Sequence, residues 1–350
     1  MTTIARRITG GVDTHLDTHV AAALDERGAL LGTQSFATTS AGYRALLHWL
    51  EGFGSVELVG VEGTGSYGAG LTRHLLHHKI DVVEVDRPNR QRRRRKGKSD
   101  PQDAIAAARA AQGGEASGLA KTRDGNVESM RVLRVARCSA RRSRTQAINQ
   151  MRSLISTAPD ELRAELRSLS IYQVLSVTSA YRHTGRTDVT TLTKLTLRTL
   201  ARRALSLEEE VKEIDQILKT LVAETAPELN AIDGVGTDVA SAVLVAAGDN
   251  PERLKNEATF AKLCGVSPLD ASSGKQVRHR LNRGGNRQAN SALWHIVFTR
   301  MVGDPRTRHY IERRMKDGRT KKEAIRCLKR YVAREVFTAL PRSQFALDSP

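Results

Sequence analysis

The chain has 350 residues, a formal net charge of +18 and only 4% aromatic residues. This length allows two or three domains, and this charge favours a polyanionic partner such as a nucleic acid. So few aromatic side chains argue against base stacking as the main mode of binding. Three widely spaced cysteines exclude a disulfide framework and a zinc cluster, and no apolar run is long enough to cross a membrane. We therefore expect a basic, cytoplasmic protein without a membrane partner.

The first third of the chain is expected to form an α/β domain with a mixed sheet. Three strands in succession are followed by alternating helices and strands, which is the pattern of such a sheet. The fourth strand is almost continuously apolar, as is typical of a central strand buried on both faces. The expected strands are 8–15, 18–24, 30–37, 56–61 and 80–85, and the expected helices are 40–53, with Ser40 as its cap, and 71–78.

A strongly basic run follows the last of these strands. Eight of the twelve residues from Arg87 to Lys98 are lysine or arginine, and none is acidic. Such a run suits the phosphate backbone of a nucleic acid. The residues of this run expected to contact phosphates are Arg92, Arg93, Arg94 and Arg95.

Four carboxylates occupy informative positions in this domain. Asp13 lies within the first strand and Glu62 ends the fourth, while Asp100 and Asp103 open a helix expected to continue over 105–111. An acid in a buried strand is costly unless it is paired or bound to a metal. Taken alone, these two acids have an ordinary explanation. Ser99 or Asp100 can cap the helix, Pro101 suits its first turn, and Asp103 complements the helix dipole. The four together have the layout of an RNase H/RuvC-like nuclease site, which holds two Mg²⁺ ions ~4 Å apart.

Other polar residues of the domain are expected to have structural roles. Asp17 is expected in a turn, and His15, like the other histidines of this domain, in the core or on the surface. The glycine-rich stretch Gly63–Gly70 lacks the Lys-Ser/Thr of a phosphate loop, so it is expected to be a flexible turn.

The segments GVDTHLDTHV, VEGTGSYG and KSDPQDA resemble the N-terminal DEDD domain of transposases of the insertion-sequence 110 family, also called 110/116/902. Described members are Mg²⁺-dependent DNA recombinases, and some are guided by a structured bridge RNA. The resemblance therefore implies Mg²⁺ as cofactor and DNA as partner, with a bridge RNA as a further candidate partner. It also implies the metal-binding set Asp13, Glu62, Asp100 and Asp103.

A long basic helix is expected over 127–155. Arginines recur along it, beginning with Arg131 and Arg134, and no acid lies between Arg131 and Arg152. An amphipathic helix of this kind packs its apolar stripe inward and offers guanidinium groups to phosphates, although a solvated face is the alternative.

Farther along, apolar residues from Leu197 to Leu221 recur in heptad alternation, which predicts a coiled coil with a second copy or with another helix of the chain. A homo-oligomer, dimer or tetramer, is therefore expected, and the threonine-rich segment 184–196 is expected to be a linker.

A Gly-x-Gly turn and a serine loop characterise the last part of the chain. Gly234 and Gly236 stand between two expected helices, as in a helix-hairpin-helix motif, whose backbone N–H groups hold a phosphate. The loop Ala271-Ser272-Ser273-Gly274-Lys275 suits a phosphate cradle or, less often, a serine nucleophile. The family resemblance continues from Ala231 to about Met301 and implies that the catalytic serine lies in this loop. Relatives often have two glycines after the serine, so Ser272 and Ser273 remain rivals, with Ser273 preferred. The basic residues expected to contact phosphate here are Lys275, Arg278 and Arg280.

These observations predict a DNA transposase built from three parts. They are an RNase H/RuvC-like catalytic domain (1–125), a basic helix and coiled-coil segment (126–225), and an all-α domain with the serine loop (226–340), whose last helix begins with a capping box at Thr320. Three alternatives remain. One is a RuvC-like junction nuclease using metal-activated water, and one is a non-catalytic nucleic-acid-binding protein. The third is a sugar-kinase/actin-type ATPase, against which the net charge argues.

Overall fold

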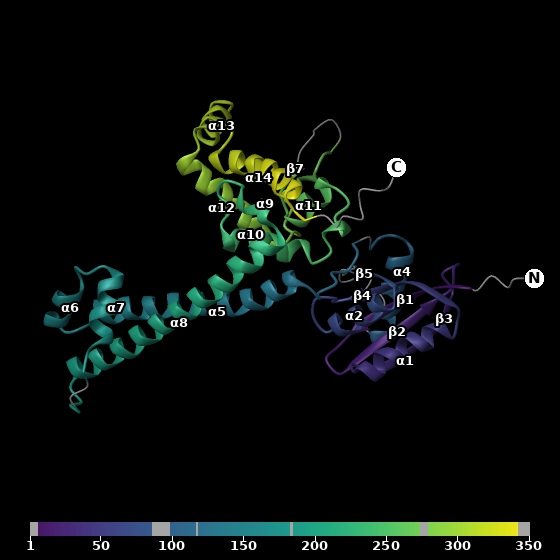
Figure 1. Cartoon of the computed structure of the whole chain (residues 1–350), viewed down its shortest axis with the longest axis horizontal. Coiled ribbons are helices and arrows are strands. Elements are labelled where there is room, and N and C mark those ends of the chain that lie inside the picture. Colours follow the sequence, from purple (N-terminus) through teal and green to yellow (C-terminus); the bar gives the residue numbers. More distant parts are fainter. Residues whose placement is uncertain (1–5, 86–98, 117, 183–184, 274–278, 342–350) are drawn as a thin grey trace, which may run out of the picture. The chain divides into compact units, whose positions relative to one another are not determined.

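The computed structural model describes residues 6–85, 99–116, 118–182, 185–273 and 279–341, which fall into two compact units (Figure 1). Unit 1 contains the described residues up to Val127 together with Ala247–Phe260. Unit 2 contains Glu128–Ala246 and Ala261–Pro341. The sequence-based division separates 126–225 from 226–340. In the structure, both segments belong to unit 2, except for residues 126–127 and Ala247–Phe260, which belong to unit 1.

Unit 1 is built on a five-stranded mixed sheet with the strand order β3-β2-β1-β4-β5. The first three strands form an antiparallel meander, and β4 and β5 then add in parallel on the other side of β1. The predicted mixed α/β region is therefore confirmed, with β1 at its centre. The strands are β1 (Arg7–Thr14), β2 (Thr18–Leu24), β3 (Leu30–Ala37), β4 (Ser55–Glu62) and β5 (Asp81–Val85).

Helices cover both faces of this sheet, and alternate residues of β1 show which helix lies on which face. A Cβ on Gly10 would lie 3.1 Å from Leu50 of α1 (Ser40–Glu51), whereas one on Gly11 would lie 2.1 Å from the backbone N of Ala108 in α4 (Asp100–Gln112). Since successive strand residues point to opposite faces, α1 and α4 lie on opposite sides. Helix α2 (Ala69–His77) contributes to the same core as α1 through Leu71 and Leu75.

The N-cap of α1 is Thr39 and not the expected Ser40. Thr39 has an extended backbone, and its hydroxyl accepts a hydrogen bond from the N–H of Gly42 at 3.1 Å. Both residue types cap well, so the backbone dihedral angles at the strand–helix turn decide between them.

A segment distant in sequence completes unit 1. Asn250 accepts a hydrogen bond from the N–H of Thr122 and donates one to the carbonyl of Ala120. Asp249 accepts a hydrogen bond from the N–H of Val127 at 2.8 Å, which satisfies one of the free donors in the first turn of α5. These contacts attach Ala247–Phe260, which includes a short 3-10 helix (Pro251–Arg253), to the end of the N-terminal domain.

Unit 2 is helical. Helices α5 (Asn126–Ser156) and α8 (Val189–Thr225) are its longest elements, and α6 (Asp160–Leu166) and α7 (Ile171–Ser179) pack with them at one end (Figure 1). Three residues of the predicted heptad seam, Leu197, Leu200 and Ala204, are buried in one core with residues of α5, α6 and α7. This part of the seam is therefore covered from within the chain, so the heptad pattern does not by itself require a second copy.

The predicted linker over 184–196 is wrong from residue 189 onward. Helix α8 already begins at Val189, and Asp188 caps it by accepting a hydrogen bond from the N–H of Thr191 at 3.0 Å. The threonines are accommodated because their hydroxyls donate to carbonyls one turn back, as Thr193 does to Val189.

Unit 2 also contains further helices and a short two-stranded ladder. Thr320 and Glu323 form the predicted capping box at the start of α14. Of the described helices, none is long and apolar enough to cross a membrane. The elements are α9 (Pro227–Asn230), α10 (Thr237–Ala247), α11 (Glu257–Leu263, which begins in unit 1), β6 (Leu269–Asp270), β7 (His279–Arg280), α12 (Arg287–Gly303), α13 (Pro305–Lys316) and α14 (Lys321–Thr338).

Candidate metal centre, serine loop and arginine helix

Asp13 is placed against the start of α4 by the strand periodicity of β1. Gly11 faces α4 so closely that a Cβ would lie 2.1 Å from the N of Ala108 and 2.3 Å from the carbonyl oxygen of Ala104. Asp13, two residues later, points to the same face. Its side chain is buried, with the residue only 6% exposed. The close packing at Gly11 therefore sets the distance between Asp13 and the acids of α4.

We expect Gly11→Ala to destabilise unit 1 by more than the ~1–3 kcal/mol typical of overpacking, because the added methyl would meet backbone and not a flexible side chain. Gly118→Ala is the matched control, since a Cβ there would meet nothing within 4 Å. Denaturant melts of the two variants check this, and equal midpoints would contradict the close contact between β1 and α4.

Asp100 and Asp103 lie on the first turn of α4, as expected. Ser99 is the N-cap residue with an extended backbone, although its side chain makes no capping hydrogen bond, and Pro101 lies in the first turn. Asp103 is buried at 6% exposure, and Asp100 is half-buried. Burial raises the pKa of Asp13, and the carboxylates of Asp103 and Asp100 raise it further.

His15 joins this cluster, contrary to its expected role as an ordinary core or surface histidine. Its Nε2 lies 3.2 Å from Oδ2 of Asp13 and 3.5 Å from Oδ1 of Asp100. Among the described residues, Asp13, His15 and Asp100 form the group of possible metal ligands whose atoms all lie within 4.8 Å of one another. His15 follows directly after β1, and its meeting with Asp100 depends on the placement of α4 over the sheet.

Glu62 lies at the adjacent strand end but outside that group. Val12 of β1 pairs with Val61 of β4 in parallel register, so Glu62 follows directly beside Asp13. Its backbone carbonyl accepts a hydrogen bond from the hydroxyl of Thr14 at 2.8 Å. The structure thus brings Asp13 together with Asp100, Asp103 and His15, and places Glu62 on the neighbouring strand.

The cluster carries an electrostatic cost that a cation would relieve. Burial raises the pKa of Asp13, His15 lowers it, and the carboxylates of Asp103 and Asp100 raise it again. A buried carboxylate with carboxylate neighbours favours the charged form only when a positive charge is supplied. Oxygen ligands of this kind fit a hard divalent cation such as Mg²⁺.

Ser272 and Ser273 follow β6, which forms a short antiparallel ladder with β7. Leu269 pairs with Arg280, and Asp270 pairs with His279. Ser272, Ser273 and Arg280 are exposed, whereas Lys275 and Arg278 lie outside the described residues, as do Arg92, Arg93, Arg94 and Arg95 of the basic run. Ser272 is held by a neighbouring acid, because its N–H and its hydroxyl both donate to Oδ1 of Asp270.

A buried lysine supports the base of this loop. Lys329 of α14 is 9% exposed, and its Nζ donates to Oδ1 of Asn290 at 2.6 Å. The amide nitrogen of Asn290 donates in turn to the carbonyls of Cys264 and Gly265, which precede β6. Gly285 approaches the same point, since a Cβ on it would lie 2.2 Å from the N of Gly265. These contacts fix the polypeptide that leads into the serine loop.

Burial lowers the pKa of Lys329 from 10.5, and the nearby Arg326 adds to this effect. A depressed lysine pKa destabilises the folded state below that pKa, and the penalty disappears as the pH rises toward 10.5. We therefore expect the free energy of unfolding of the unmodified protein, relative to Lys329→Met, to increase between pH 7 and pH 10. The Cys264 thiol, whose pKa burial raises to about 12, stays neutral over this range.

Denaturant melts of both proteins at several pH values check this prediction. Lys321→Met, which changes an exposed lysine of the same helix, is the matched control and should show no such divergence. Parallel pH profiles for Lys329→Met and the unmodified protein would show that Lys329 is not destabilised by its surroundings.

The Gly-x-Gly turn lies between α9 and α10. Gly234 has a φ of +80°, a conformation that favours glycine, and a Cβ on Gly236 would meet nothing within 4 Å. The carbonyl of Asp233 accepts a hydrogen bond from Nε of Arg300 at 2.9 Å. The turn is thus held from α12 on one side, while the position of Gly236 is open.

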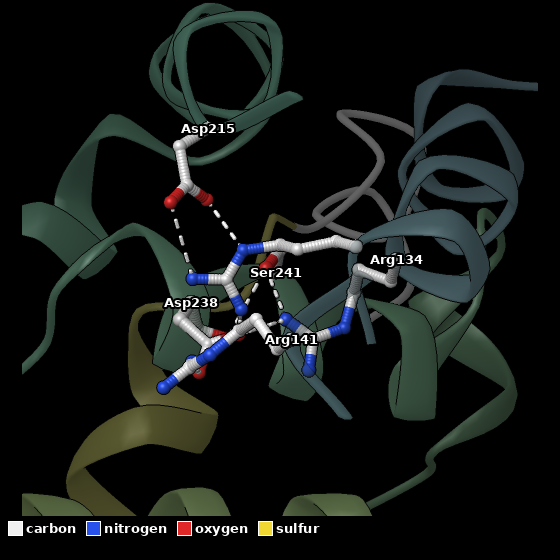
Figure 2. Close-up of polar contacts among 6 residues, drawn as sticks. Arg134, Arg141, Asp215, Asp238 and Ser241 are labelled. Atoms are coloured by element: carbon white, nitrogen blue, oxygen red, sulfur yellow. Dashed lines mark hydrogen bonds and ion pairs between the residues drawn. The ribbon is translucent and has the colours of Figure 1, made fainter. Parts of the chain in front are cut away.

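The arginines of α5 do not form one uniform basic surface. Arg134 and Arg137 are each 7% exposed, and both donate to Oδ1 of Asp238 at 2.8 Å (Figure 2). Arg134 also donates to Ser241, and Arg137 also pairs with Asp215 of α8. The arginine side chains are buried, whereas those of Asp238 and Asp215 are 43% and 39% exposed, so solvent screens part of the attraction. Arg134, expected on a phosphate-binding face, therefore lies in the interior of unit 2, where it joins α5 to α10.

Two further arginines of this helix are also engaged within the chain. Arg131 pairs with Glu128 at 2.7 Å, and Arg144 pairs with Glu208 at 3.0 Å. The acids that balance them lie before the basic stretch or in α8, which is why the stretch itself shows none.

Other arginines of the helical pair remain at the surface. Arg141 and Arg142 are exposed in the middle of α5, although Arg141 comes within 3.9 Å of Asp238. At the end of the helix pair, a cavity of about 560 Å³ opens between α5, α6 and α7. Its polar lining includes Arg152, Arg163 and Arg167, all exposed. Arg163 pairs with Asp160 at 2.6 Å, which leaves Arg152 and Arg167 as the arginines of this cavity best placed to meet phosphate groups.

Comparison with known proteins gives matches in both units. A DEDD-type IS110 model described as "Transposase" matches residues 10–160, and a model described as "Transposase IS116/IS110/IS902 family" matches residues 226–312. A stretch of 149 residues is 29% identical to the "Insertion element IS110 uncharacterized 43.6 kDa protein" of Streptomyces coelicolor. That stretch covers 42% of this chain and 36% of the relative, so the match spans about a third of the relative's length.

Proposed function

We propose that this chain, matched by IS110-type transposase models over residues 10–160 and 226–312, is the transposase of an insertion sequence. It would cleave and rejoin DNA through a Mg²⁺-binding acidic site and a loop serine. The observation that carries this proposal is the grouping of Asp13, His15 and Asp100 within 4.8 Å of one another, with the buried Asp103 on the same turn of α4 as Asp100. Glu62, at the neighbouring strand end, completes the proposed acidic set.

The domain that holds these acids is proposed to be RNase H/RuvC-like. Support comes from a mixed sheet with β1 at its centre, one acid on β1, one at the end of β4, and two on a later helix. The cation bound there would neutralise charge on the scissile phosphate and on the leaving oxygen. The carboxylates of the chain would hold and orient it, and their burial would exclude competing water.

The proposed nucleophile is a serine of the β6–β7 loop, with Ser273 preferred over Ser272. Its Oγ would attack the phosphorus, forming a phosphoserine bond as the P–O bond to the deoxyribose breaks and a free hydroxyl leaves. A hydroxyl on the partner strand would then attack the phosphoserine and release the serine, so the number of phosphoester bonds is conserved. Arg280 and the predicted Lys275 and Arg278 would neutralise the phosphate charge.

DNA is the proposed substrate, and a structured bridge RNA is a proposed further partner. The net charge of +18, the exposed Arg141 and Arg142, and the arginine-lined cavity at the end of the helix pair support contact with phosphates. The glycine turn at Gly234 and Gly236 is proposed as another backbone contact. A homo-oligomer, dimer or tetramer, remains part of the proposal.

The proposal is tested by mobilisation of a marked element. The DNA that surrounds this gene, with a resistance marker in place of the coding sequence, is placed on a plasmid, and the protein is supplied from a second plasmid. We expect excision and insertion of the marker to depend on the protein. Absence of mobilisation, with the protein folded and expressed, would count against transposase activity.

We expect Arg141→Ala combined with Arg142→Ala to lower the salt dependence of nucleic-acid binding. Each lost phosphate contact should reduce the slope of log K against log salt by about 0.9 on duplex DNA, or about two units in total. Arg27→Ala with Arg73→Ala, two exposed arginines of unit 1, makes the same change in net charge and should leave the slope nearly unchanged. Equal slopes for both double variants would show that this part of α5 is merely solvated.

A further inference from the structure

His15 is the residue of the acidic cluster that neither its residue type nor its surroundings in sequence explain. Its side chain is 40% exposed and its ring nitrogen faces two carboxylates, one from β1 and one from α4. The backbone fixes this position, since the N–H of His15 donates to the carbonyl of Thr18 at 3.1 Å and closes the turn between β1 and β2. The ring is therefore held at the cluster by the strand connection and not by a flexible loop.

Nε2 of His15 makes a hydrogen bond of 3.2 Å with Oδ2 of Asp13, and its distances to both carboxylates also match those between ligands of one ion. Charge-assisted N–H···O hydrogen bonds are usually about 2.7–2.9 Å long. The observed separations are 3.2 Å to Asp13 and 3.5 Å to Asp100. Neighbouring ligands of an octahedral ion with bonds of about 2.1 Å are roughly 3 Å apart or slightly more. All three ligand atoms lie within 4.8 Å of one another, so one small cation could contact all three.

An imidazole among carboxylates changes which cation the site prefers. Mg²⁺ favours oxygen ligands and gives up its water reluctantly, whereas transition-metal ions accept imidazole nitrogen readily. A single nitrogen ligand added to carboxylates therefore favours Mn²⁺ over Mg²⁺ without closing the site to either.

We propose that His15 is a direct nitrogen ligand of the divalent cation and gives this centre a preference for Mn²⁺ over Mg²⁺. This inference rests on the proposed function, because it assumes that the acidic cluster binds a metal. It adds to that function a ligand of a different chemical type, which increases the preference for Mn²⁺ beyond that of carboxylates alone.

The test measures metal binding to the full chain, independently of DNA cleavage. Electron spin-echo spectroscopy of the Mn²⁺-loaded protein should show coupling to an imidazole nitrogen, and His15→Gln should remove it. By calorimetry, His15→Gln should weaken Mn²⁺ binding by at least roughly tenfold, with a change of about twofold or less for Mg²⁺. His48→Gln, which alters an exposed histidine of α1, is the matched control and should change neither.

Absence of nitrogen coupling in the Mn²⁺-loaded unmodified protein would overturn the inference, whatever the variants do. Equal losses of Mg²⁺ and Mn²⁺ affinity in His15→Gln would also overturn it, because His15 would then act through the fold and not as a selective ligand. Asp13→Asn separates this failure from that of the proposed function. If Asp13→Asn abolishes metal binding, the acidic metal centre is supported even when His15 is not a ligand. If Asp13→Asn still binds metal normally, both the acidic metal centre and the role of His15 are wrong.

Discussion

Replacing Asp13 or Asp103 by asparagine is expected to abolish metal-dependent DNA cleavage while leaving DNA binding nearly unchanged. Both carboxylates are buried at 6% exposure, and asparagine preserves their shape while removing the charge that a cation requires. Metal-assisted stabilisation of the transition state is worth several kcal/mol, so the rate should fall by roughly a thousandfold or more. Cleavage and binding are measured separately on DNA carrying the ends of the element.

Asp17→Asn is the matched control for these variants. Asp17 lies in the turn after β1, it is exposed, and its backbone carbonyl accepts a hydrogen bond from Thr38. Its replacement should leave cleavage intact. Full Mg²⁺-dependent cleavage by both Asp13→Asn and Asp103→Asn would falsify the acidic metal centre and would favour a protein that only binds nucleic acid.

Ser273→Ala is expected to remove both DNA cleavage and any covalent protein–DNA species, whereas Ser272→Ala should have a milder effect. A serine hydroxyl attacks phosphorus only if it is accessible and the phosphate charge is neutralised. Both serines are exposed, but the hydroxyl of Ser272 is already donated to Asp270. Cells producing each variant together with the element are lysed in denaturant, and the DNA that remains attached to the purified protein is quantified.

The outcomes of this experiment distinguish three mechanisms. If Ser272→Ala is inactive while Ser273→Ala cleaves, Ser272 is the nucleophile, and Asp270 is positioned to accept its proton. If both variants cleave normally and no attached DNA is found, metal-activated water performs the cleavage, as in a junction nuclease. Metal and DNA binding should be retained in both variants, which shows that a loss of cleavage arises from the hydroxyl and not from unfolding.

Local sequence patterns were sufficient for the elements that carry the acids. The apolar run of β4, the small and β-branched residues of β1 and the Ser-Asp-Pro start of α4 each predict their element from neighbouring residues alone, and the structure contains all three. The positions of Asp13, Glu62 and Asp103 in those elements were likewise evident from sequence. Strand and helix signals are local, because they depend on periodicity and capping within a few residues.

Partners of charged side chains were not predictable in this way. The arginines of α5 form an unbalanced basic stretch in sequence, yet Arg134 and Arg137 are buried against Asp238 and Asp215 from helices about 80 to 100 residues away. Similarly, His15 could not be assigned to the acidic cluster until α4 was placed over β1. Sequence determined which side chains were available and on which faces they lie. Only the tertiary structure decided which of them meet, because the energy of an ion pair or a metal site depends on distance in space and on burial.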